Sequence, residues 1–314
     1  MKGSIRFEVR NERTSFQHTF ERNITIIKGH SATGKSTMVN MVRNYENLGR
    51  QSGVKLSCDH PCHVLEGYDW ENRLQNIHDS LVFIDEGNNF VRSEAFAGAI
   101  PSTDNYYVIS VRDPLFTLPY SIDSVFEIVT KGKKHTFQKL FEGDRISDFY
   151  AVDFDIVVTE DAQSGYQFFK KAAGFLHREA FSAAGKSNLL PTIEKYEGKK
   201  LLMIADAAAL GPEMTGLQQY QDMHPDEIFF MLPESFEWMI LKSGLLKKDE
   251  IRRILEHPSD YIESREYLSW EQFFTDLLIK STKDDDLMRY SKSKLADFYM
   301  NRVNTDKILQ VLKR

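Results

Sequence analysis

The sequence predicts an α/β protein, in which a domain with a parallel-sheet core is followed by a smaller α/β domain and a helical C-terminal tail. Three observations support this prediction. Short apolar runs separated by helix-sized segments occur at residues 23–28, 80–84 and 106–112, as is typical of buried parallel strands. A second series of such runs begins near residue 155. From residue 246 onward, apolar residues recur at three- and four-residue spacing, which indicates helices.

The first of these strands runs directly into GHSATGKST, which matches the pattern GxxxxGK[ST]. In this pattern two glycines let backbone N–H groups converge on phosphate oxygens, and a strand before it with an amphipathic helix after it makes the match specific. We expect Lys35 to reach the outer phosphates and Ser36 to offer its hydroxyl to Mg²⁺, while the helix dipole adds positive potential. The predicted ATP site comprises Gly29, His30, Ser31, Ala32, Thr33, Gly34, Lys35, Ser36 and Thr37.

The strand at residues 80–84 ends in two carboxylates, Asp85 and Glu86. Asp85 is expected to hold Mg²⁺ and Glu86 to polarise the water that attacks the terminal phosphate. An acidic strand end facing solvent is the simpler interpretation. The position about fifty residues beyond the phosphate loop favours a Walker B strand and ATP hydrolysis. Lys35, Asp85 and Glu86 are therefore the predicted catalytic residues of this domain, with Ser36 and Asp85 as its metal ligands.

The third strand, at residues 106–112, carries two polar residues near its end, Ser110 and Arg112. Either side chain could sense the terminal phosphate of bound ATP. An ordinary strand end followed by the turn at residues 112–114 explains the same pattern equally well.

Together these elements resemble the additional-strand class of P-loop ATPases over roughly the first 150 residues. The resemblance implies ATP hydrolysis with Mg²⁺. No LSGGQ-like signature lies between the two motifs, which argues against the dimer sandwich of ABC-type members. No arginine finger can be assigned either, so an active site shared with a neighbouring subunit stays open.

A second α/β pattern follows a predicted hairpin, formed by residues 124–129 and 135–141, and a polar linker. The strand at residues 155–159 ends at Glu160, and the strand at residues 200–205 ends at Asp206. Carboxylates at the ends of parallel strands can share a Mg²⁺ ion. The predicted domains are residues 1–150, 151–245 and 246–314.

This order, with a Gly-Lys loop at residues 185–186 between the two acidic strand ends, resembles the Toprim domain of topoisomerases, primases and OLD-family nucleases. A P-loop ATPase joined to such a domain is the architecture of compact OLD-family and related phage-defence ATPases. The resemblance implies that Glu160 and Asp206 are catalytic metal ligands of a nuclease. Toprim nucleases generally carry Asp-x-Asp where this chain has Asp206-Ala-Ala208, and Asp161 or Glu213 are the candidates to replace the missing carboxylate.

Composition places the chain among globular proteins of the cytoplasm. Hydrophobic residues make up 41% and charged residues 27%, and no apolar run is long enough to cross a membrane. The N-terminus alternates like a strand and lacks the apolar core of a signal peptide. The net charge of −6 argues against a generally basic nucleic-acid coat.

Two local features leave alternatives open. The tail from residue 287 is rich in Lys and Arg with three aromatics among them, so it is either an amphipathic helix with core aromatics or a patch for DNA or RNA. The two cysteines lie in the cluster Cys58, His60, Cys62 and His63, which is either a zinc site or a pair of ordinary thiols. Pro61 stiffens this short segment and favours the thiols.

The leading functional hypothesis is a Mg-dependent ATPase whose nucleotide state controls a Toprim-like domain, with nuclease activity in mobile-element or phage defence. The alternative is an ATP-driven regulatory switch, in which an inactive second domain binds a protein partner or a second copy of the chain. A small-molecule kinase is a weaker third hypothesis, because Glu86 beside Asp85 favours activation of water.

Overall fold

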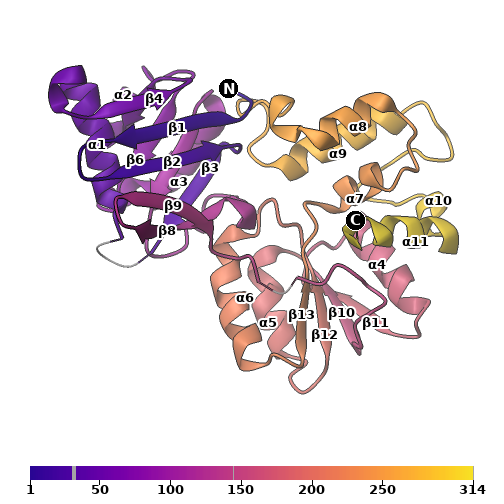
Figure 1. Cartoon of the computed structure of the whole chain (residues 1–314). Coiled ribbons are helices and arrows are strands. Elements are labelled where there is room, and N and C mark those ends of the chain that lie inside the picture. Colours follow the sequence, from indigo (N-terminus) through magenta and orange to yellow (C-terminus); the bar gives the residue numbers. More distant parts are fainter. Residues whose placement is uncertain (30–32, 144, 314) are drawn as a thin grey trace. The chain divides into compact units, whose positions relative to one another are not determined.

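The computed structural model describes residues 1–29, 33–143 and 145–313, and it shows an α/β protein (Figure 1). The chain divides into two compact units. The first comprises Met1–Phe141 and His257–Ser269, and the second comprises Glu142–Glu256 and Trp270–Arg314. None of the helices in the described ranges is long and apolar enough to cross a membrane.

The first unit is built on a mixed nine-stranded sheet with the order β4-β1-β2-β9-β8-β3-β7-β6-β5. Strands β8, β3, β7, β6 and β5 run parallel to one another, whereas the pairs β1–β2, β1–β4 and β8–β9 are antiparallel. Only three residues join the edge strands β4 and β5, so the sheet curls until it is nearly closed. The strands are β1 (Ile5–Arg10), β2 (Ser15–Phe20), β3 (Ile24–Lys28), β4 (Lys55–Cys58), β5 (Cys62–Val64), β6 (Leu81–Ile84), β7 (Tyr106–Ser110), β8 (Val125–Lys131) and β9 (Lys134–Lys139).

The core of this unit forms where helix α1 (Lys35–Leu48) packs on the inner face of the curled sheet. Alternate residues of β1 point inward and are buried, as expected for a sheet with one face toward the core. The helix contributes Met38, Val39 and Val42, which pack with apolar residues of β1, β2, β6 and β7. Two shorter helices, α2 (Trp70–Leu74) and α3 (Glu94–Ala99), carry Trp70 and Phe96, whose ring centroids lie 5.5 Å apart.

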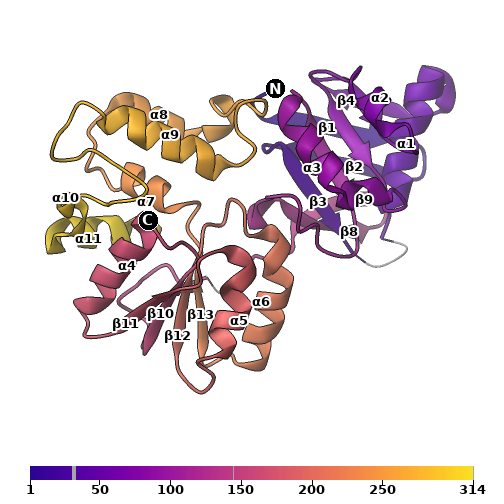
Figure 2. The same ribbon diagram turned by 180° about the vertical axis from the view of Figure 1, so that it is seen from behind.

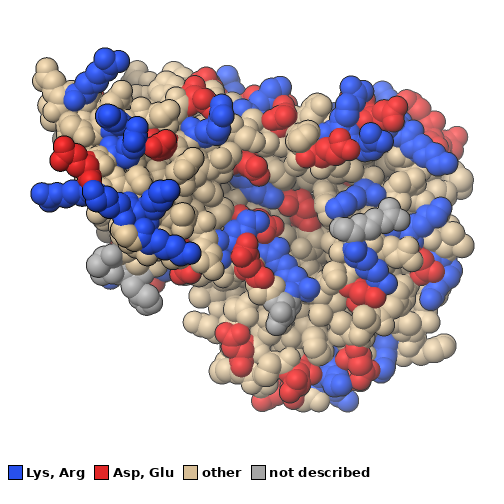
Figure 3. Space-filling model, in the orientation of Figure 1, with Lys and Arg blue, Asp and Glu red and all other residues tan. Residues whose placement is uncertain are grey.

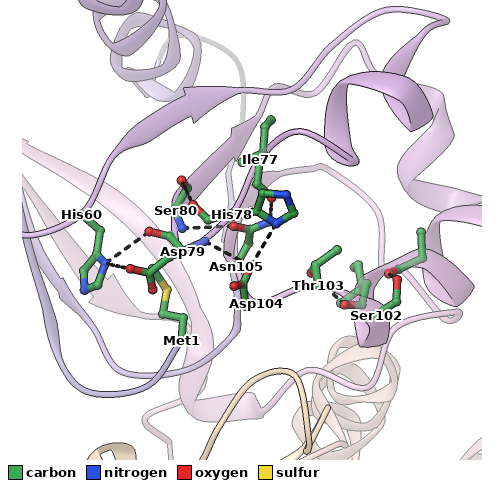
Figure 4. A network of polar contacts seen from close by, with 12 residues as sticks. Met1, His60, Ile77, His78, Asp79, Ser80, Ser102, Thr103, Asp104 and Asn105 are labelled. Carbon is green, nitrogen blue, oxygen red and sulfur yellow. Dashed lines mark hydrogen bonds and ion pairs between the residues drawn. The ribbon is translucent and has the colours of Figure 1, made fainter.

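A polar network fastens the N-terminal ends of β6 and β7 (Figure 4). The Asn105 side chain accepts a hydrogen bond from the Ser80 backbone N–H at 3.0 Å and donates to the Ile77 carbonyl at 2.8 Å. The Asp104 carboxylate accepts from the backbone N–H of Asp79 at 3.1 Å. Because β6 and β7 are parallel, this network holds the edge of the sheet opposite to their carboxyl ends.

The second unit contains a four-stranded parallel sheet with the order β11-β10-β12-β13. Helix α4 lies on one side of this sheet, and α5 and α6 lie on the other (Figures 1 and 2). The elements are β10 (Ile156–Thr159), α4 (Ser164–Gly174), β11 (Glu179–Ser182), α5 (Leu189–Glu194), β12 (Leu201–Ile204), α6 (Gly211–Met223) and β13 (Ile228–Met231). Five further helices follow: α7 (Phe236–Lys242), α8 (Asp249–Glu256), α9 (Trp270–Thr282), α10 (Asp297–Met300) and α11 (Arg302–Leu309).

The structure confirms the predicted α/β class, the parallel sheet of the second unit and the C-terminal helices. The predicted hairpin is also confirmed, as β8 and β9. The first sheet is larger than expected, because its parallel core continues into β9, β2, β1 and β4, which pair antiparallel except for the parallel pair β2–β9. In the tail, Tyr290 and Tyr299 are buried, as the amphipathic interpretation requires.

Candidate functional site

The phosphate-loop motif lies between the buried strand β3 and helix α1. Gly34 precedes the helix with φ 98°, in the left-handed region that favours glycine. A Cβ atom there would lie 3.3 Å from the rings of Phe16 and His135, so a side chain would also be crowded. Within the motif, His30, Ser31 and Ala32 lie outside the described residues.

Lys35 is the first residue of α1, and its side chain is only 4% exposed. Its Nζ donates to the Gly29 carbonyl and lies 3.7 Å from Oε2 of Glu86. The other carboxylate oxygen of Glu86 pairs with Nε of Arg112. The structure therefore brings three of the predicted residues together and places the Glu86 carboxylate between two cations.

Ser36 and Asp85, which are 49 positions apart in the sequence, meet through a hydrogen bond from the Ser36 hydroxyl to Oδ1 of Asp85 at 3.2 Å. The same carboxylate oxygen accepts the backbone N–H of Glu86 at 2.9 Å. Asp85 follows β6, and its backbone carbonyl accepts from the Asn88 side chain at 3.0 Å. These bonds fix the carboxylate toward the first turn of α1.

A cavity of about 410 Å³ opens over these groups. It has the size of a nucleotide pocket, and the first turn of α1 on its wall has no acidic residue to oppose the helix dipole. Ser110, in contrast, does not line this cavity; its hydroxyl is buried and has no hydrogen-bond partner among the described residues. The lining residues are Thr33, Gly34, Lys35, Ser36, Thr37, Asp85, Glu86, Gly87 and Arg112.

A larger cavity of about 480 Å³ lies elsewhere in the first unit and contains none of the predicted nucleotide-binding residues. Helices α2 and α3 form much of its wall. The part of its lining that the structure describes mixes polar and apolar residues and includes the carboxylate Glu71 but no Lys or Arg, which does not suit phosphate, so we place the candidate nucleotide site at the smaller cavity. The residues lining the larger cavity are Trp70, Glu71, Leu74, Gln75, Ile77, His78, Ala95, Ala99, Ser102 and Thr103.

In the second unit, Glu160 and Asp206 also meet, at the carboxyl ends of β10 and β12. The backbone N–H of Asp206 donates to Oε2 of Glu160 at 3.3 Å, and Oδ1 of Asp206 accepts the Phe236 N–H at 3.0 Å. Burial, together with the charge of Glu271, raises the pKa of Glu160 to about 7 and the pKa of Asp206 well above its usual range. A cavity of only about 20 Å³ adjoins both carboxylates, which is room for about one water molecule.

Asp161 and Glu213, the two candidates to replace the carboxylate missing from the Asp-x-Asp pattern, have other contacts. Asp161 accepts the backbone N–H groups of Gln163 and Gly165 and so caps the start of α4. Glu213 lies 3.9 Å from Nζ of Lys186. Within the described ranges, no three His, Cys, Asp or Glu side chains are grouped in a way that could hold a metal ion.

A buried polar network beside these carboxylates was not predicted. The Tyr290 hydroxyl donates to Oε1 of Glu237 at 2.6 Å and lies 2.7 Å from the Ser164 hydroxyl. Lys292 donates to Glu271 at 2.6 Å. Burial alone would lower the pKa of Lys292, but the charges of Glu271 and Glu237 raise it instead. In the sequence, Lys292 is one of several cations in the tail, and the two interpretations of the tail place it in solvent or in a nucleic-acid patch.

Most of the tail cations in the described residues are similarly paired. Arg289 contacts Asp286, Arg302 contacts Asp306, and Lys313 contacts Asp148, all within 3.4 Å. With Lys292, four of the six described cations between residues 287 and 313 are thus in ion pairs.

The cysteines lie on neighbouring edge strands as free thiols. Hydrogen bonding with Cys62 lowers the pKa of Cys58 to about 7. His63 binds Glu46 of α1 at 2.8 Å, while His60 contacts Asp79, so the two imidazoles have separate partners.

No protein-family model matches this sequence, and a search of curated proteins finds no match.

Proposed function

We propose that this chain is a Mg²⁺-dependent ATPase whose nucleotide state controls its second, Toprim-like unit. The observation that carries the proposal is the contact between Ser36 and Asp85 at 3.2 Å, beside the buried Lys35. Two sequence motifs with complementary roles in phosphate chemistry thus converge on one cavity. The order of the parallel core supports the additional-strand class, because β7 lies between the phosphate-loop strand β3 and the acidic strand β6.

The oxygens of Ser36 and Asp85 suit Mg²⁺, which prefers hard oxygen ligands. Neighbouring ligands of an octahedral Mg²⁺ at ~2.1 Å lie ~3.0 Å apart, close to the separation found here. Ser36 and Asp85 would hold the ion, which would neutralise charge on the transferred phosphate.

The remaining side chains of the site have distinct roles in the proposal. Lys35 binds the outer phosphates, and backbone N–H groups at the start of α1 orient them. Glu86 orients and polarises the attacking water. Arg112, which pairs with Glu86, is suited to respond to the terminal phosphate, because an anion near it competes with that carboxylate for the guanidinium.

The second unit supports a Toprim-like assignment through its four parallel strands and the acidic ends of β10 and β12. One observation favours the alternative, in which this unit is catalytically inactive and binds a protein partner. A buried alanine, Ala208, stands where a second metal carboxylate is expected, and Asp161 is engaged as a helix cap. Two carboxylates alone fall short of the ligand set that a two-metal phosphodiester hydrolysis needs. A role in mobile-element or phage defence rests on the family resemblance.

The test is ATP turnover by the purified chain with Mg²⁺ and with EDTA. We expect Mg²⁺-dependent hydrolysis that Lys35→Ala abolishes and that Glu86→Gln lowers on the order of 100-fold or more, because it removes a general base. Lys247→Ala, an exposed lysine of the second unit, is the matched control and should turn over ATP normally. Turnover that is equal in all four proteins would reject the assignment.

Nucleic-acid cleavage assays separate the two versions of the second unit. Cleavage that is lost in Glu160→Ala, with ATP turnover retained, would establish a nuclease. Robust turnover without cleavage in Mg²⁺ or Mn²⁺ would favour the inactive, partner-binding version.

A further inference from the structure

On the outer face of the curled sheet in the first unit, Lys and Arg side chains outnumber carboxylates. Alternate residues of β1, β2, β4 and β9 point away from the core, and among them are exposed Lys and Arg side chains. The turns that join β1 to β2 and β8 to β9 add further cations beside them. Figure 3 shows Lys and Arg gathered over these strands. We call this set the basic face: Arg10, Arg13, Lys55, Lys131, Lys133 and Lys134.

Strand register aligns part of this charge in one row. Lys55 is the direct partner of Arg10, Arg10 is the partner of Ser15, and Ser15 is the partner of Lys134. Directly paired residues of neighbouring strands present their side chains on the same face. With strands ~4.8 Å apart, the row crosses four strands and spans ~14 Å. That length corresponds to about four base steps of a nucleic-acid duplex.

The like charges in this face oppose stability. Arg10 and Lys55 are cross-strand partners, and so are Lys131 and Lys134, and like charges in such positions repel. Glu8 lies 3.3 Å from Arg10, but both side chains are about half exposed, so the pair contributes little. Lys55, Lys131 and Lys134 have no ion pair with any described carboxylate. Positions that break a local rule in this way are expected at functional surfaces.

A shallow cavity of about 370 Å³ lies within the basic face. Arg10, Lys133 and Lys134 stand on its wall together with Ser15 and Thr14. The partly exposed Ser15 hydroxyl can donate to a phosphate oxygen between these cations, which outnumber the one carboxylate of the described lining, Glu8. The aromatic residues of these strands, such as Phe16 and Phe20, are buried on the opposite face and so offer no stacking platform for bases.

We propose that the basic face binds the phosphate backbone of a nucleic acid without reading its sequence. Charge complementarity, a row of phosphate-scale length and the absence of aromatics on this face together favour a backbone contact. The inference goes beyond the proposed function by naming a partner class and its binding surface. It does not depend on ATP hydrolysis, because no residue of the basic face lines the nucleotide cavity.

The basic face is close in register to the phosphate loop. The pair next to Ser15 and Lys134 is Phe16 with His135, whose rings stack at 4.3 Å and crowd Gly34. The rings nearest to Gly34 thus lie one residue along β2 and β9 from the basic face.

The test measures binding of a short labelled DNA duplex of random sequence to the full chain by fluorescence anisotropy. If four cations contact phosphates, affinity should fall on the order of 100-fold between about 50 and 200 mM salt. The double variant Lys55→Gln with Lys134→Gln should bind on the order of tenfold more weakly and reduce the log–log salt slope by about two. Lys294→Gln with Lys307→Gln removes the same charge from exposed positions of the tail and should bind like the unmodified chain.

Several outcomes would overturn the proposal: no binding of duplex by the unmodified chain at low salt, equal losses in both double variants, or sedimentation with phosphatidylserine vesicles in place of DNA binding. Thermal unfolding provides a check on folding, because removing Lys55 relieves repulsion with Arg10 and should not lower the Tm. ATP binding by the same proteins is measured in parallel. Normal ATP binding without duplex binding would reject the basic face alone, and duplex binding without ATP binding would reject the proposed function alone.

Discussion

His18 makes the stability of the first unit depend on pH. It lies on the inner face of β2 among aromatic rings, with centroid distances of 4.5 Å to Phe137, 4.6 Å to Phe126 and 4.8 Å to Phe20. Burial in this apolar cluster lowers the pKa of His18 from 6.5 to about 4. The folded chain therefore holds the imidazole neutral at pH values where an unfolded chain would protonate it.

The direction and size of the effect follow from linkage. Because the folded pKa is the lower one, the stabilisation is fully present above pH 6.5 and is lost as the pH falls toward 4. At pH 5, unfolded His18 is almost fully protonated and folded His18 is almost entirely neutral. The resulting loss relative to pH 8 is about 2 kcal/mol, and it approaches about 3 kcal/mol below pH 4.

The assay is urea unfolding at pH 8 and pH 5, with hydrogen exchange of peptides from β2 to report on the first unit. His18→Phe keeps the ring and removes the titration, so it should lose about 2 kcal/mol less stability than the unmodified chain over this range. Carboxylates elsewhere titrate in both proteins, so their contributions to the pH-dependent change in stability cancel when the two proteins are compared. His257→Gln, at an exposed histidine, is the control. Equal acid sensitivity of His18→Phe and the unmodified chain would refute the reasoning.

Two further predictions concern the second unit. A Cβ at Gly165 would lie 2.6 Å from Oδ2 of Asp161, so Gly165→Ala should lower the free energy of unfolding by about 1–3 kcal/mol in urea. Gly174 lies in the same helix, and a Cβ there would meet nothing within 4 Å. Gly174→Ala should therefore raise the free energy of unfolding by up to about 1 kcal/mol. Equal effects of the two changes would count against the capping contact. Tyr290→Phe removes a buried hydroxyl that is hydrogen-bonded to a carboxylate and should lower the free energy of unfolding by about 1–3 kcal/mol. As the control, Tyr68→Phe at a fully exposed ring should change it by less than about 0.5 kcal/mol. No change in Tyr290→Phe would contradict a stabilising role of the network.

Local patterns predicted several residues that line the cavity over the phosphate loop, because these residues belong to short, contiguous motifs. The spacing of Gly34, Lys35 and Ser36 after a strand fixes their placement at the start of a helix. Asp85 could be assigned to the same site because parallel strands bring their carboxyl ends to one edge of the sheet. Arg112 and Ser110 could not be ranked, since only the packing of β7 decides which of them reaches the cavity.

Long-range pairing explains what pattern reasoning missed. Lys292 meets Glu271 and Glu237 across segments that no local periodicity connects. The basic face depends on the registers between β4, β1, β2 and β9, which bring Lys55 and Lys134 into one row although 79 positions separate them. Such contacts depend on the tertiary fold, and a single sequence carries no direct signal of them.

The central claim is that the cavity over the phosphate loop binds ATP with Mg²⁺, and calorimetric titration of ATP into the purified chain tests it most directly. The account predicts a single site per chain that binds more tightly with Mg²⁺ than with EDTA. Binding should be lost in Lys35→Ala, weakened toward the EDTA level in Asp85→Asn, and retained in Glu86→Gln, which impairs only the chemical step. Absence of ATP binding in the unmodified chain, or binding that ignores both Lys35 and Mg²⁺, would contradict the account.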